Sequence, residues 1–103
     1  MADILEVSEG VQLQSADEEL SYTITTTNWA STPTSPTFIA WDLITGGTVT
    51  ATVFPSGTAS LNGDVISLPL LKSLTKGHTY RVEVKFTAGG SIWEPYFRVK
   101  CLI

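Results

Sequence analysis

The chain has 103 residues, of which 43% are hydrophobic and 16% charged, so it is long and apolar enough to bury the core of one domain. Its formal net charge is −4, and its six basic residues mostly alternate with acidic or apolar ones, which argues against nucleic-acid binding. No apolar run is long enough to span a membrane, and the first residues lack the pattern of a signal peptide. We therefore expect residues 1–103 to form a single domain that binds neither nucleic acid nor membrane.

The N-terminal part of the chain is predicted to contain short strands followed by a polar turn. Residues 3–14 predict one or two short strands, with Gly10 as a bulge or bend between them. The stretch 15–19 contains three adjacent carboxylates, but it has neither the ligand spacing nor the glycine of a calcium loop. We expect a solvated turn there and no metal site.

The next segment combines a regular strand with a loop. Residues 20–27 predict a strand, because apolar residues alternate there with serine and threonine. The loop predicted over residues 28–37 is rich in serine, threonine and proline and contains Trp29. Trp29 either caps the open end of the core or is an exposed contact. The cap is the favoured interpretation, because an indole ring left in water costs free energy.

Two strands are predicted around a pair of glycines. Residues 38–44 predict a strand in which Ile39, Trp41 and Leu43 share one face, and we place Trp41 in the core. Gly46 and Gly47 predict a hairpin turn, since glycine accepts a positive φ at no steric cost. The alternation over residues 48–54 predicts the returning strand.

A second hairpin is predicted at the Asn62-Gly63 pair, which lies between two alternating runs. Ile66 and Leu68 are expected to face inward. Pro69 is expected to end the pairing, because proline has no N–H to donate to a neighbouring strand.

The clearest strand pattern of the chain lies between residues 80 and 86. One face holds Tyr80, Val82, Val84 and Phe86, and the other holds Arg81, Glu83 and Lys85. Alternation of this kind is typical of a strand with one dry face and one wet face.

The last strand is predicted over residues 91–101, after the turn at Gly89 and Gly90, with Pro95 indicating an edge position or a bulge. Its alternation is expected to turn Phe97, Val99 and Cys101 inward and Tyr96, Arg98 and Lys100 outward. Cys101 is the only cysteine, so no intrachain disulfide is possible, and we expect a buried, chemically quiet thiol.

Leu74, Gly77 and Tyr80 resemble, in type and spacing, the corner before the sixth strand of fibronectin type III and related immunoglobulin-like domains. The resemblance covers about a tenth of the chain. It implies that the Tyr80 hydroxyl bonds to the chain just upstream. With the turn signals along the chain, it leads us to expect an all-β fold, an immunoglobulin-like sandwich of about seven antiparallel strands.

A looser resemblance covers most of the chain. Residues 22–29, 61–71 and 80–101 resemble small immunoglobulin-like proteins encoded among bacteriophage and prophage structural genes. This resemblance implies a non-enzymatic structural or protein-interaction module, made in the bacterial cytoplasm and carried in the virion, with other virion proteins as possible partners. The alternative is a carbohydrate- or cell-surface-binding module of adhesin type.

Catalysis is not expected from this sequence. His78 is the only histidine, it lies in the predicted corner, and no Gly-x-Ser-x-Gly motif accompanies it. With Cys101 it makes only two soft metal ligands, too few for a zinc site. We expect no enzyme activity, no cofactor and no metal.

Binding to a protein partner is the favoured activity, with Trp93, Tyr96 and Trp29 as candidate contact residues. Trp93 and Tyr96 have opposite phases on one short strand, so at least one of them is expected to be exposed. For Trp93, packing over the end of the core is an equally open interpretation.

Overall fold

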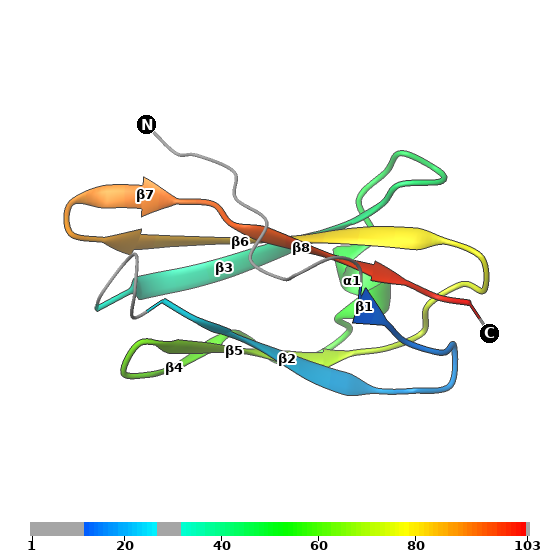
Figure 1. Ribbon diagram of the computed structural model, residues 1–103, viewed down its shortest axis with the longest axis horizontal. Coiled ribbons are helices and arrows are strands. Elements are labelled where there is room, and N and C mark those ends of the chain that lie inside the picture. The colour runs from blue at the N-terminus through cyan, green and yellow to red at the C-terminus, as the bar shows by residue number, and fades with distance from the viewer. Residues whose placement is uncertain (1–11, 27–31, 103) are drawn as a thin grey trace.

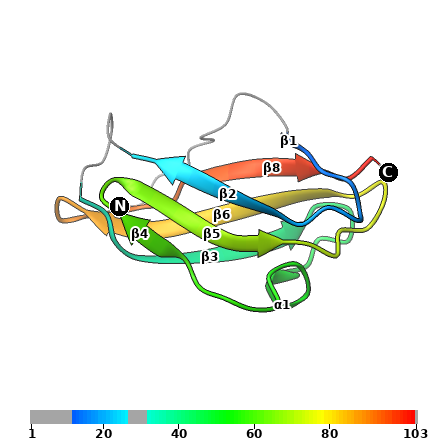
Figure 2. The ribbon, with the colours of Figure 1, turned by 90° about the horizontal axis from the view of Figure 1, so that it is seen from below.

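The computed structural model describes residues 12–26 and 32–102, which form two β-sheets facing each other and one short helix (Figures 1 and 2). The larger sheet has the order β1-β8-β6-β3, with β7 also paired to β6, and the smaller sheet has the order β2-β5-β4. The elements are β1 (Gln12–Leu13), β2 (Leu20–Thr25), β3 (Thr34–Asp42), α1 (Thr50–Val53), β4 (Ser60–Asn62), β5 (Val65–Leu71), β6 (Thr79–Ala88), β7 (Ser91–Trp93) and β8 (Tyr96–Lys100). The expected all-β class is therefore confirmed.

Strand β6 organises the larger sheet, because it pairs with β3 on one side and with β7 and β8 on the other. Its alternation is the predicted one, and it buries every second side chain from Tyr80 to Ala88. These side chains meet Ile24, Ile66 and Leu71 of the smaller sheet in one core. Burial of this apolar surface, at about 25 cal/mol per Å², is the main force that holds the two sheets together.

The pairing of β1 departs from the expectation of antiparallel strands. Gln12 and Leu13 lie parallel to Val99 and Lys100 of β8, while the other strand pairs in the described residues are antiparallel. β1 and β8 are far apart in the sequence and no tight turn joins them, so they are free to pair in parallel.

The faces of β3 are opposite to the predicted ones, and the placement of Trp41 in the core was wrong. Ala40 is fully buried and Asp42 is 5% exposed, whereas Ile39 and Leu43 are each 45% exposed. Both phases of this strand contain large apolar residues, so alternation alone could not choose between them. The buried phase is the one whose carboxylate, Asp42, finds hydrogen-bond partners inside the structure.

The beginning of β3 also differs from the prediction. The strand starts at Thr34, inside the predicted loop, and continues past Pro36 through a shift in its pairing with β6. Ser35 adopts a φ of 53° at this irregularity. The shift lets the strand continue where the proline has no N–H to donate.

The predicted strand over residues 48–54 was also wrong. Thr48 makes a single bridge to Trp41, and Thr50–Val53 form the short helix α1. The Thr50 hydroxyl accepts the Ala40 N–H at 3.0 Å, and the Val49 N–H donates to the Ala40 carbonyl at 2.8 Å. These two bonds satisfy the N–H and the carbonyl of Ala40, and Val53 and Phe54 are buried in the core.

The Asn62-Gly63 hairpin is confirmed, with Asn62 paired to Val65 across a loop of Gly63 and Asp64. Gly63 has a φ of 62°, a conformation that glycine adopts without strain. Ile66 and Leu68 are buried as predicted. Pro69 does not end the pairing, because β5 regains register with β2 at Leu70.

Pro95 interrupts the last strand without adding a residue. Trp93 pairs with Phe86 and Tyr96 pairs with Glu83, so both strands keep one register across the interruption. Pro95 is buried and accepts the Val84 N–H at 2.9 Å. The gap between β7 and β8 therefore reflects the missing N–H of proline and not a bulge. The predicted elements before residue 12, and Trp29, lie outside the described residues.

Candidate functional site

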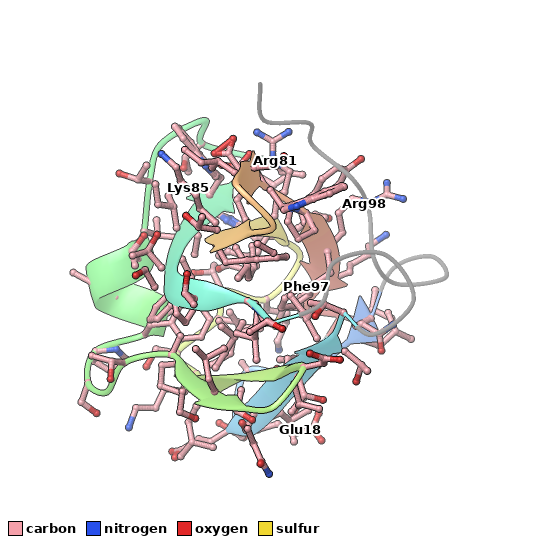
Figure 3. The ribbon with its side chains drawn as sticks, turned by 90° about the vertical axis from the view of Figure 1, so that its left-hand side faces the viewer. Glu18, Arg81, Lys85, Phe97 and Arg98 are labelled. Carbon is pink, nitrogen blue, oxygen red and sulfur yellow. The ribbon has the colours of Figure 1, made fainter. Side chains whose placement is uncertain are left out.

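The larger sheet turns one face away from the smaller sheet, and this surface is called the outer face here. Figure 3 shows Arg81, Lys85 and Arg98 projecting from it, whereas Phe97 lies between the sheets and Glu18 lies at the opposite side of the molecule. Its main residues on the strands are Ile39, Trp41, Arg81, Glu83, Lys85, Tyr96, Arg98 and Lys100. Leu43 follows β3, and its N–H continues the pairing with β6 by donating to the Thr79 carbonyl at 2.8 Å, so by alternation we place it on the same face.

Strand register brings these side chains together in two rows across three strands. Ile39, Glu83 and Tyr96 form one row. Trp41, Arg81 and Arg98 form the next. Side chains directly opposite in neighbouring strands lie close enough to interact, so β3 contributes apolar surface beside the charges of β6 and β8.

Glu83 joins the two rows through both of its carboxylate oxygens. The Trp41 Nε1–H donates to Glu83 Oε1 at 3.0 Å, and Arg81 Nη2 lies 2.9 Å from Glu83 Oε2. The Arg81 guanidinium carbon lies 5.6 Å from the centroid of the Tyr96 ring, within the range of a cation–π contact. Four side chains from three strands therefore fix one another's positions within the chain.

The linked side chains are shielded to different degrees. The Glu83 side chain is 12% exposed and that of Arg81 is 35% exposed. Among the described residues, Arg81 Nε is a buried donor without a hydrogen-bond partner. The Arg81 head group is thus fixed by Glu83 and Tyr96, and the exposed part of the outer face includes Ile39, Leu43 and the two lysines.

Of the contact residues predicted from the sequence, the two that the structure describes, Trp93 and Tyr96, face opposite sides of the larger sheet. Tyr96 lies on the outer face, half-buried beside Arg81. Trp93 is half-buried and packs against the core. Trp29 lies outside the described residues. Ile39, Trp41 and Leu43 are surface residues that the sequence did not identify, because Ile39 and Trp41 are placed there by their register opposite Glu83 and Arg81.

The corner before β6 is a structural site. Tyr80 is 2% exposed, and its hydroxyl accepts the Thr75 N–H at 2.7 Å. Leu74 is buried beside it, and Gly77 has a φ of 86° that a side chain would strain. The Gly77 N–H donates to the Cys101 carbonyl at 2.6 Å, which ties the corner to the end of the chain described here.

His78 is paired with Asp42, a buried carboxylate at the last position of β3. Its Nδ1 donates to Asp42 Oδ2 at 2.7 Å, and Asp42 Oδ1 accepts the N–H groups of Ile44 and Thr45 at 2.9 and 3.3 Å. Burial would raise the pKa of Asp42, but the hydrogen bonds from His78 and the two N–H groups outweigh it and lower that pKa. The pair fastens the turn after β3 to the corner.

Cys101 is fully buried, as expected, and burial raises the pKa of its thiol although Lys76 opposes the shift. The reactive form of cysteine is the thiolate, which this environment disfavours. Its low reactivity stays a prediction.

A shallow hollow of about 240 Å³ lies near the start and end of the described chain, lined by Leu13, Gln14, Ser15, Glu18 and Leu102. Gln14 is 2% exposed and uses its whole amide inside the protein. Its Nε2 donates to the carbonyls of Leu71 and Glu18 at 2.7 and 3.0 Å, and Oε1 accepts the Tyr22 hydroxyl at 2.8 Å. Gln14 thus ties the segment after β1 to the end of the smaller sheet where β2 begins and β5 ends. Its amide is already bonded within the protein, so it adds no free polar group to the hollow.

Comparison with known proteins identified no relative: no family matches the sequence, and no curated protein or solved structure is significantly similar to it. Within residues 12–26 and 32–102, no three side chains of the metal-ligating types gather into a cluster. In the same part of the chain, no helix has the length and apolar character needed to cross a membrane.

Proposed function

We propose that this chain is a non-enzymatic protein-interaction module with an immunoglobulin-like fold, carried as a component of a phage or prophage particle. The connectivity supports the fold: β2-β5-β4 faces β3-β6-β8, which is the strand order of the two sheets in such domains. The Tyr80 hydroxyl bond at the corner gives further support. With β7 and β8 counted as one interrupted strand, the described chain has seven strands.

The observation that carries the interaction function is the outer face. Two aliphatic side chains, Ile39 and Leu43, are each 45% exposed there, beside Trp41 and Tyr96. Aromatic and arginine side chains dominate the binding energy of many protein interfaces, and those held in place beforehand lose less entropy on binding. The Glu83 and Arg81 contacts supply that order.

The virion assignment is supported by the resemblance to phage-encoded immunoglobulin-like proteins, and a direct experiment tests it. The full chain is expressed in the bacterium that carries its gene, the prophage is induced, and purified particles are analysed by mass spectrometry. We expect the chain to copurify with particles. A chain recovered only in the particle-free fraction would contradict the assignment.

The interaction surface is tested in the same assay with a matched pair of double variants. Ile39→Ser with Leu43→Ser alters the outer face, and Leu61→Ser with Leu70→Ser removes two leucines of similar exposure, 41% and 45%, from the smaller sheet. Since all four side chains are exposed, both variants are expected to fold, which circular dichroism checks. We expect the first variant to reduce incorporation about tenfold and the second to leave it unchanged. Equal incorporation of the two would contradict the assignment of the surface.

A further inference from the structure

The outer face has a charge opposite to that of the chain as a whole. It carries four of the six basic residues: Arg81, Lys85, Arg98 and Lys100. Its acidic residues are Glu83 and also Glu94, which lies between β7 and β8 and which we place on this face because side chains alternate along the interrupted strand. Among the described residues, four positive and two negative charges give +2 on this face, and the two basic and five acidic residues elsewhere give −3. Such segregation of charge on one face favours partners of the opposite sign.

The charges of the outer face are not all available to a partner. Glu83 is already bonded to Arg81 and Trp41, so its negative charge is largely compensated within the protein. Lys85 and Lys100 are exposed: Lys85 lies on β6, next to β3, and Lys100 lies on β8, which β6 separates from β3. A matching partner therefore needs carboxylates opposite β6 and β8 and apolar side chains opposite β3.

We propose that the outer face binds an acidic protein surface that combines carboxylates with apolar side chains, a proposal that rests on the function proposed above. A second copy docking through the same face is disfavoured, because like charges would oppose each other. Nucleic acid is disfavoured as a partner, because the acidic residues Glu83 and Glu94 lie among the basic side chains and would repel phosphate. The exposed Ile39 and Leu43 side chains have no group that binds phosphate.

The test is an NMR titration of the full ¹⁵N-labelled chain with two synthetic peptides, one alternating glutamate with valine and one alternating lysine with valine. We expect the glutamate peptide to shift amide signals of β3, β6 and β8 and the Trp41 indole signal. Raising sodium chloride from about 50 to about 300 mM is expected to weaken its binding several-fold, because salt screens exposed charges. The lysine peptide is expected to leave the spectrum unchanged. A response confined to other strands, or equal responses to both peptides, would overturn the proposal.

Two double variants with the same change in net charge test the role of the face. Lys85→Glu with Lys100→Glu alters the outer face, whereas Lys72→Glu with Lys76→Glu alters the two basic residues elsewhere. We expect the first to weaken binding of the glutamate peptide about tenfold and the second less than twofold. Equal losses would show that only net charge matters and would overturn the proposal, as would tighter binding of a single-stranded oligonucleotide.

This proposal can fail separately from the proposed function. If Ile39→Ser with Leu43→Ser abolishes incorporation into particles while Lys85→Glu with Lys100→Glu has no effect there or on the peptides, the outer face is an interface whose partner is not acidic. If neither pair affects incorporation, the proposed surface itself is wrong.

Discussion

The two sheets enclose one core but have very different outward surfaces. Strands β2, β4 and β5 contain no charged residue, and their outward positions are mostly small hydroxyl or amide side chains: Thr23, Thr25, Ser60, Asn62 and Ser67. The outer face of the larger sheet carries long side chains that bond to one another across three strands. Threonine and serine suit a half-exposed strand, so the contrast is consistent with the proposal that the larger sheet carries the interaction surface.

The largest expected effect tests which side of β3 faces the core. Ala40→Glu is expected to lower the free energy of unfolding by about 4 kcal/mol, because it buries a charge in a filled space. Ile39→Glu is expected to cost less than about 1 kcal/mol, because Ile39 is 45% exposed. Urea unfolding of both variants measures the difference. A larger loss for Ile39→Glu would reverse the assignment of the outer face.

The next largest effect concerns Asp42, the last residue of β3, and its hydrogen bond with His78. Asp42→Asn is expected to lower the free energy of unfolding by about 2 kcal/mol at neutral pH, because the charged hydrogen bond from His78 is lost. The pKa of Asp42 is lower in the folded protein, so its contribution is present above about pH 4 and is lost as the pH falls through the folded-state pKa. Unfolding curves measured from neutral to acid pH should therefore converge for wild type and variant. A constant difference down to the lowest pH would contradict the role given to Asp42.

A smaller effect is expected at the corner. Tyr80→Phe is expected to cost about 1 kcal/mol, because the buried hydroxyl no longer accepts the Thr75 N–H. Thermal and urea unfolding measure the change. An unchanged midpoint would count against a stabilising role for the corner.

The smallest effect compares the two outward surfaces directly. Glu83→Gln is expected to cost about 0.5–1 kcal/mol, because it weakens the ion pair with Arg81 in a half-shielded site. Ser67→Ala on the smaller sheet is expected to change stability by less than about 0.5 kcal/mol. Equal effects of the two substitutions on urea unfolding would mean that the linked side chains of the outer face add nothing to the stability of the fold.

Some elements could be predicted from the sequence because the local residue pattern is compatible with only one assignment. In β6 every outward residue from Arg81 to Lys85 is charged, so only one phase could be buried. The turn at Gly63 was equally clear, because few other residues accept its positive φ.

Other elements depend on contacts between distant residues. The faces of β3 could not be assigned because Asp42 is buried through His78, 36 residues away. The residues of α1 alternate like a strand, and their helix is favoured by bonds to Ala40. The contacts of Trp41 with Glu83 require the register of β3 against β6, which no local pattern contains.

The central claim is that the larger sheet, through its outer face, binds the protein partner. Hydroxyl-radical footprinting of the free chain and of the chain assembled in particles measures this directly, side chain by side chain. We predict that Ile39, Leu43 and Tyr96 lose reactivity on assembly while Leu61 and Leu70 keep theirs. Protection of Leu61 and Leu70, with unchanged reactivity on the outer face, would contradict the claim.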